Sequence, residues 1–172
     1  MAVHPIRLLG DPVLRQRAKR VPQVDASVQR LIDDMIDSMR EASGVGLAAP
    51  QIGVPLRVIV IEVPDEEVVA LVNPEIVKRS GQRRLEEGCL SIPGYRAEVP
   101  RSLSVVVKGM DRQGHPVRIK AKDDLLAHAL EHEIDHINGV LYIDHLESLD
   151  ELTRIEPEPD EEEEEEEVTA GP

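Results

Sequence analysis

Two histidines and two carboxylates lie within five consecutive residues, His132-Glu133-Ile134-Asp135-His136. Histidines four positions apart in a helix project from one face, so their imidazole nitrogens can hold one metal ion. Glu133 directly follows the first histidine, close enough to exchange a proton with water at the metal. A chance pair of helical histidines, satisfied by neighbouring groups, is the alternative interpretation. The motif favours a metal site that activates water.

A catalytic metal site usually has three protein ligands and one open position, so a third ligand is needed. His145 and Glu147 lie downstream, where H-E-x-x-H peptidases usually carry theirs, and Cys89 lies upstream in Glu87-Gly88-Cys89-Leu90-Ser91. A reduced cysteine is more often a small buried apolar residue than a ligand. Cys89 nevertheless follows a glycine among polar residues, where a thiolate ligand is reasonable. Spacing alone leaves the choice open.

A glycine-containing segment, Gly44-Val45-Gly46-Leu47-Ala48-Ala49-Pro50-Gln51-Ile52-Gly53, also suits a binding site. It matches the pattern G-x-G-x-x-G/A, but a dinucleotide fingerprint follows a strand and opens a helix, whereas this segment follows a predicted helix and runs into Pro50. We expect a tight loop in which Gly44 and Gly46 let the backbone approach an extended ligand. Gln51 then offers a neutral amide donor for an oxyanion. A structural turn with a surface glutamine is the alternative.

The histidines are predicted to lie on a central helix over about 124–138, which begins after Asp123 as N-cap and ends at Asn138-Gly139. Its apolar residues cover most of the circumference, which is typical of a helix surrounded by the rest of the fold. These residues are Leu125, Leu126, Ala129, Leu130, Ile134 and Ile137. Polar groups on such a helix are costly to bury unless they are paired or bind a ligand.

Other elements are predicted from periodicity. Residues 26–43 carry one apolar stripe at three- and four-residue steps, which predicts a helix with one buried face. Segments 56–63 and 68–72 are rich in valine and isoleucine and are predicted to be strands, and 103–109 with 116–121 are predicted to form a hairpin. Residues 1–24 contain three prolines and are expected to be irregular.

Length and charge bound the organisation of the chain. Its 172 residues allow one domain with a sizeable core. The formal net charge is −14, but ten of the 34 carboxylates lie between Glu156 and Glu167, so residues 1–155 carry only −4. We therefore predict a catalytic domain over 1–155 and a disordered acidic tail over 156–172.

Several classes of protein are disfavoured by composition. The chain has no net basic character, so direct nucleic-acid binding is not expected. No apolar run approaches the roughly 20 residues of a membrane helix. The N-terminus lacks a secretory pattern, and a single cysteine cannot form an internal disulfide. We expect a cytoplasmic protein without membrane association, and a monomer by default.

Three segments together resemble the peptide deformylase family: G-V-G-L-A-A-P-Q-I-G at 44–53, E-G-C-L-S at 87–91 and H-E-I-D-H at 132–136. Their order and separation are similar, and the resemblance covers about residues 3–150. It implies an α+β fold in which antiparallel β-sheets pack around the central helix that carries the H-E-x-x-H metal motif. It also implies a metal-dependent hydrolase that removes the N-formyl group from the formyl-methionine of newly synthesised polypeptides and releases formate.

The resemblance further implies roles for individual residues. The metal ligands would be Cys89, His132 and His136, with Fe²⁺ as the usual native ion and Zn²⁺, Ni²⁺ or Co²⁺ as substitutes. Glu133 would be the general acid/base, and Gln51 with the backbone N–H of Leu90 would stabilise the oxyanion. Val45 and Leu85 would help close the methionine pocket. Helix geometry adds further lining residues to that pocket, namely Leu125, His128 and Ala129.

Three features depart from common family sequences. Glu131 stands where glutamine is frequent, which is expected to change a hydrogen bond around the metal ligands. His128 stands where many relatives carry an apolar residue. The chain ends in an acidic run where some relatives carry a basic helix that docks on the ribosome, so basic ribosomal proteins near the exit tunnel are a better candidate partner than RNA. A solubilising appendage without a partner is the alternative.

Two other functions remain as alternatives. An H-E-x-x-H peptidase would use His145 or Glu147 in place of Cys89 as its third ligand. A catalytically silent relative would bind basic proteins through the acidic tail, but such a protein has no need of Glu133, Gln51 and Cys89 together.

Overall fold

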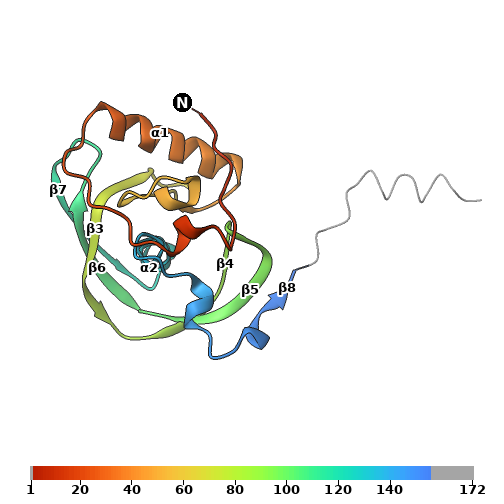
Figure 1. The fold of residues 1–172 in the computed structure, drawn as a ribbon. Coiled ribbons are helices and arrows are strands. Elements are labelled where there is room, and N and C mark those ends of the chain that lie inside the picture. The colour runs from red at the N-terminus through yellow and green to blue at the C-terminus, as the bar shows by residue number, and fades with distance from the viewer. Residues whose placement is uncertain (1, 156–172) are drawn as a thin grey trace, which may run out of the picture.

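Two antiparallel sheets curve around one helix, α2 (Leu125–Ile137), as Figure 1 shows. The computed structural model describes residues 2–155, so the predicted disordered acidic tail over 156–172 lies outside the described residues. The second long helix, α1 (Ala26–Glu41), covers one side of the molecule. This arrangement confirms the predicted α+β fold with the H-E-x-x-H motif on the enclosed helix.

The larger sheet has five strands in the order β1-β2-β3-β6-β7. All of its neighbours pair antiparallel. Its members are β1 (Gly46–Ala48), β2 (Val58–Ile61), β3 (Val69–Ser80), β6 (Ser104–Met110) and β7 (Pro116–Lys122). The smaller sheet contains β4 (Arg83–Cys89), β5 (Ile92–Arg101) and β8 (Thr153–Arg154), in that order. Consequently β1 and β4 are edge strands, one in each sheet.

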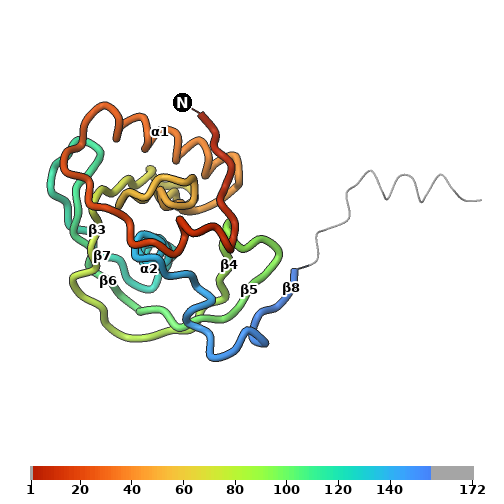
Figure 2. The backbone as a smooth tube through the Cα atoms, in the orientation of Figure 1, coloured from red at the N-terminus to blue at the C-terminus, as the bar shows by residue number. Residues whose placement is uncertain are grey.

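Short 3₁₀ helices connect these elements: η1 (Pro12–Arg15), η2 (Ala49–Ile52), η3 (Tyr142–His145) and η4 (Leu149–Glu151). The largely irregular N-terminal segment, red to orange in Figure 2, runs across the molecule and contacts the end of α2, where the Ala18 N–H donates to the Ile137 carbonyl over 2.8 Å. Neither α-helix among the described residues is long and apolar enough to cross a membrane.

Helix α2 is held by apolar contacts on most sides. Eight of its residues are buried, and the apolar ones among them join a cluster with Ile59, Ile61, Leu71, Val105 and Val107 from the larger sheet. Its N-cap is Asp124, whose carboxylate accepts the Ala127 N–H at 2.8 Å, and not Asp123 as predicted. Asp123 instead adopts a left-handed conformation with φ of 51°, which turns the chain from β7 into the helix.

The segment 44–53 is more regular than the predicted tight loop. Three of its residues form β1, in which Leu47 pairs with Val60 of β2, and the next four form η2. A strand of three residues is not predicted here, because the glycines and the proline around it are typical of a loop. The strand predicted over 68–72 is longer in the structure, where β3 continues to Ser80. The second half of β3 pairs with β6, but it is exposed and has few apolar residues, so the apolar pattern does not predict it. The predicted hairpin is confirmed as β6 and β7.

Candidate metal centre and its cavity

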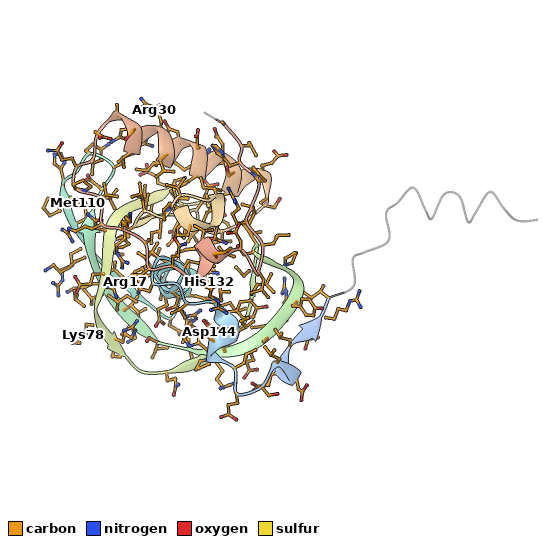
Figure 3. The ribbon with its side chains drawn as sticks, viewed as in Figure 1. Arg17, Arg30, Lys78, Met110, His132 and Asp144 are labelled. Carbon is orange, nitrogen blue, oxygen red and sulfur yellow. The ribbon has the colours of Figure 1, made fainter. Side chains whose placement is uncertain are left out.

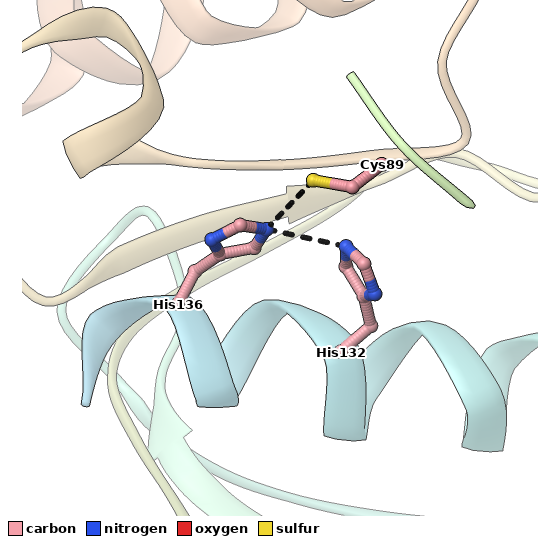
Figure 4. Close-up of side chains that lie close together, drawn as sticks. All are labelled: Cys89, His132 and His136. Carbon is pink, nitrogen blue, oxygen red and sulfur yellow. Dashed lines mark hydrogen bonds between the residues drawn. The ribbon is translucent and has the colours of Figure 1, made fainter. Parts of the chain in front are cut away.

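Three donor atoms converge between α2 and the end of β4, as Figure 4 shows. The Nε2 atoms of His132 and His136 are 3.2 Å apart, and the Cys89 Sγ lies 3.3 Å from His136 Nε2. All three donors lie within 4.8 Å of one another. Ligand atoms about 2.1–2.3 Å from one tetrahedral ion are separated by roughly 3.4–3.7 Å, so the spacing suits a single small cation.

The alternative third ligands lie elsewhere. His145 is exposed, and its ring contacts Asp135 Oδ2 at 2.8 Å, while Glu147 is exposed beyond η3. Neither belongs to the group of converging donors, which among residues 2–155 consists of Cys89 and the two helical histidines. The geometry therefore favours the cysteine. In Figure 3 His132 lies inside the molecule, whereas Arg30 and Lys78 lie at its periphery.

The electrostatics of the cluster favour one positive charge. Burial lowers the pKa of His132, but the Glu133 carboxylate and hydrogen bonds to Cys89 and Glu87 outweigh burial and raise that pKa well above its ordinary value. Burial and the neighbouring charge of His132 both lower the pKa of His136. A thiol and two imidazoles are the donor set that binds divalent transition metals once the protons on the donor atoms are released.

Glu87 orients one of these histidines. Its buried carboxylate accepts a hydrogen bond from His132 Nδ1 at 2.7 Å, and since an ionised carboxylate only accepts, Nδ1 must carry the proton. The other ring nitrogen, Nε2, is then free to bind a metal. Burial raises the pKa of Glu87, but hydrogen bonds from His128, His132 and a buried arginine outweigh it and hold the pKa far below its ordinary value.

That arginine is Arg101, which holds Glu87 bidentately. Its Nε and Nη2 atoms lie 2.9 and 2.6 Å from the two carboxylate oxygens, and its Nη1 donates to Asp135 at 2.8 Å. Neither Glu87 nor Arg101 is predicted as a functional residue from the sequence. The spacing of Glu87 two residues before Cys89, within the same short motif, is the signal that was available.

We expect Arg101→Met to destabilise the fold by about 3–5 kcal/mol, because it leaves the buried Glu87 carboxylate without its main counter-charge. Urea denaturation, with metal and after chelation, measures the change in the free energy of unfolding. Arg84→Met is the matched control, since its ion pair with Glu98 is exposed and should contribute little. Equal stability of the two variants would contradict this role of Arg101.

Glu133 projects from α2 toward β1. It is 2% exposed, its Oε1 has no hydrogen-bond partner within residues 2–155, and burial raises its pKa to about 7. A Cβ atom at Gly46 would lie 2.8 Å from its Oε2, so a larger residue there would push the Glu133 carboxyl group out of its position. A buried carboxyl group that exchanges protons near neutral pH is suited to acid–base catalysis.

Gln51 is buried, not a surface residue. Its Oε1 accepts the Ala48 N–H at 3.0 Å, which directs the amide nitrogen toward Ser91 Oγ at 3.1 Å and Cys89 Sγ at 3.7 Å. The side chain thus presents N–H donors at the metal centre. Leu90 follows Cys89 in the turn between β4 and β5 and lines the same space.

A cavity of about 490 Å³ opens beside these groups. Of the residues expected to bind substrate, six line it: Gly44, Val45, Gly46, Leu125, His128 and Ala129. Leu85 is not among its lining residues, because the wall there is formed by the neighbouring part of β4, from Glu86 to Cys89.

Two unusual helix residues have specific partners. His128 Nε2 donates to Glu87 Oε1 at 2.5 Å, so the imidazole ring is hydrogen-bonded to a carboxylate and not to a backbone group. Glu131 accepts the backbone N–H of Ser102 at 2.6 Å and lies 3.3 Å from Arg79 Nε. Glu131 therefore joins α2 to the residue that follows β5, and within residues 2–155 it has no hydrogen bond to Cys89, His132 or His136.

Comparison with known proteins places this site in a family. A family model described as polypeptide deformylase matches residues 3–152. The peptide deformylase of Dehalococcoides mccartyi strain CBDB1 is 54% identical over 161 residues, which cover 93% of this chain and 96% of that protein. The peptide deformylase of Thermomicrobium roseum is 49% identical over 168 residues, with coverage of 93% and 95%.

Solved structures agree. The crystal structure of a peptide deformylase from Legionella pneumophila matches with a TM-score of 0.83 at 42% identity, covering 99% of this chain and 100% of that one. A peptide deformylase from Synechococcus elongatus, in complex with actinonin, matches with a TM-score of 0.82 at 42% identity and coverage of 86% and 81%. Both the sequence and the fold show that this chain belongs to the polypeptide deformylase family.

Proposed function

We propose that the metal centre and its cavity carry out the family's reaction in this chain: hydrolysis of the N-formyl group of formyl-methionyl polypeptides, which releases formate and a free N-terminus. The observation that carries the proposal is the convergence of Cys89, His132 and His136 beside the buried Glu133 carboxyl in an accessible cavity. Peptide deformylases are hydrolases that act on newly synthesised polypeptides, and the chain is one of them.

The edges of the two sheets offer a binding site for an extended peptide. Gly44–Gly46 before and within β1, and Glu86–Gly88 of β4, all line the cavity. Both strands are at the edge of their sheet, so they present unpaired backbone groups. An extended formyl peptide that adds to such edges gains main-chain hydrogen bonds whatever its sequence, which suits an enzyme that processes many nascent chains.

A divalent cation held by Cys89, His132 and His136 would supply a nucleophile, because it lowers the pKa of water to about 7 and makes hydroxide available at neutral pH. Fe²⁺ is the proposed native ion, with Zn²⁺, Ni²⁺ or Co²⁺ as substitutes, since thiolate and imidazole ligands accept all of them. The Cys89 thiolate would also reduce the effective charge of the bound cation. Glu87 holds the ring of His132 in its binding tautomer.

The catalytic roles follow from position. Glu133 takes the proton of the attacking water at its carboxylate and returns it to the leaving amine nitrogen. Gln51 Nε2 and the Leu90 N–H donate to the formyl oxygen as negative charge develops on it. The buried setting strengthens these interactions, because little water competes with them.

Formate release from formyl-Met-Ala-Ser under anaerobic Fe²⁺ tests the function. The expected result is stoichiometric formate and a free amine, with acetyl-Met-Ala-Ser as the control for formyl specificity. Absence of turnover with every divalent metal tried would contradict the proposal. We further propose that the reaction takes place in the cytoplasm, on or near the ribosome, and that the enzyme acts as a monomer. Co-sedimentation with ribosomes tests the association with the ribosome. Analytical sedimentation of the enzyme by itself tests the oligomeric state.

His128→Ile is expected to preserve turnover and to lower the KM for formyl-Met substrates about three- to tenfold, because an apolar wall suits the methionine side chain better than an imidazole. Glu87 Oε1 keeps its hydrogen bond from Arg101 Nε in this variant, so the carboxylate is not left unpaired. Steady-state kinetics measure both constants, with His128→Gln as the control that retains a donor. A higher KM, or loss of metal, would mean that His128 supports substrate or metal binding.

A further inference from the structure

The cavity extends beyond the metal centre to the C-terminal segment of the described chain. Gly94 and Tyr95 of β5 line it, as does Ile155, which directly follows β8. Figure 1 shows β8 beside β5 at the outer edge of the smaller sheet. The C-terminal segment therefore builds part of the same cavity that holds Cys89 and Glu133, although it lies far from them in the sequence.

Ile155 is held in place by its neighbours. In β8, Thr153 pairs with Arg96 and Arg154 pairs with Tyr95, and the Ile155 N–H then donates to the Gly94 carbonyl over 2.8 Å. Just before β8, Leu152 packs on a separate apolar cluster formed by β5 and the segment that leads into η3. That cluster contains Ile92, Ala97, Val99, Leu141 and Tyr142. Both ends of β8 are thus fixed on the smaller sheet.

Exposed apolar side chains gather around this cavity. Of the eight large hydrophobic residues that are exposed among residues 2–155, three line it: Tyr95, Leu125 and Ile155, each about 40% exposed. Gly94 lies opposite Ile155, and a Cβ atom built there would meet no heavy atom within 4 Å. Apolar groups that face open space in a concave site are suited to contact a ligand.

We propose that Ile155 and Tyr95 form a subsite for an apolar side chain downstream of the formyl-methionine. The inference rests on the proposed function: the formyl group lies at the metal centre, and the polypeptide continues along the cavity, whose outer wall contains these two residues. Formyl-methionyl chains with a leucine-like residue soon after the methionine are then the preferred substrates. Occupancy of this surface by a second protein is the competing explanation.

Two pairs of peptides test the proposal on the full-length enzyme: formyl-Met-Leu-Ser against formyl-Met-Ser-Ser, and formyl-Met-Ala-Leu against formyl-Met-Ala-Ser. Burial of one leucine against a partly open surface predicts a kcat/KM about three- to tenfold higher for the leucine peptide in at least one pair, mainly through KM. Ile155→Ser should reduce this ratio to about twofold or less, and Ile155→Val should retain part of it. Tyr95→Ser should act in the same direction.

Leu149→Ser is the matched control, because Leu149 is an exposed apolar residue of the same segment that does not line the cavity. It should leave the preference intact. Since carboxylates begin directly after Ile155 in the sequence, the ratios are measured at low and high ionic strength. An apolar contact persists at high salt, whereas a preference caused by the acidic residues is screened.

Three results would overturn the subsite. They are equal kcat/KM values within both pairs, a leucine preference that survives Ile155→Ser, and a preference that disappears at high salt. Each leaves the deformylase function standing, because formate is still released. The second result would show that residues other than Ile155 recognise the leucine. Absence of formate from all four peptides would overturn the proposed function and the subsite together.

Discussion

Glu133→Gln is expected to lower kcat for formyl-Met-Ala-Ser by about 10²–10⁴-fold while the enzyme keeps its metal. The amide has the shape of the carboxyl group, so its packing against Gly46 is preserved, but it cannot accept and return a proton. Burial gives Glu133 a pKa of about 7, which suits both transfers near neutral pH. Formate release and metal content, measured on the same preparation, separate loss of chemistry from loss of the ion.

Glu131→Gln is the matched control for this variant. Glu131 is a buried carboxylate two residues earlier on the same helix, but its partners are Ser102 and Arg79, away from the cavity. Its kcat should therefore stay close to that of the unmodified enzyme. If Glu133→Gln kept more than about a tenth of kcat, the assignment of Glu133 as general acid/base would be wrong.

Cys89→Ser is expected to weaken metal retention by about 100-fold or more and to abolish turnover in parallel. A neutral serine hydroxyl replaces a thiolate, which is a much better ligand for Fe²⁺ or Zn²⁺. Removal of one of the three converging donors should lower the metal affinity by more than the roughly 10–100-fold caused by removing a residue that only hydrogen-bonds to a ligand. The rate of metal transfer to a chelator measures this directly.

His145→Gln and Glu147→Gln complete the test, because they remove the third ligands that a peptidase of the H-E-x-x-H type would use. Both residues are exposed, and neither belongs to the converging cluster, so both variants should retain metal and activity. Metal loss in either variant, together with tolerance of Cys89→Ser, would reverse the assignment of the ligands.

The features that the sequence by itself determined are those with local causes. Helical spacing alone put His132 and His136 on one face, and the nearly continuous apolar circumference placed their helix at the centre of the fold. Asp123 was mistaken for the N-cap because two aspartates are adjacent, and only the backbone conformation decides which one caps. The short strand β1 was missed since its side chains carry too little signal over three residues.

Only the tertiary structure decided which residues meet across the sheets. Cys89 could be chosen over His145 by resemblance, but its approach to His136 depends on how the β4–β5 turn lies over α2. The pairing of Glu87 with Arg101 and the place of Ile155 in the cavity wall have the same origin. The free energy of burying a charge depends on partners that are distant in the sequence, and so does the role of an exposed apolar side chain in a cavity wall. Periodicity and spacing do not specify these partners.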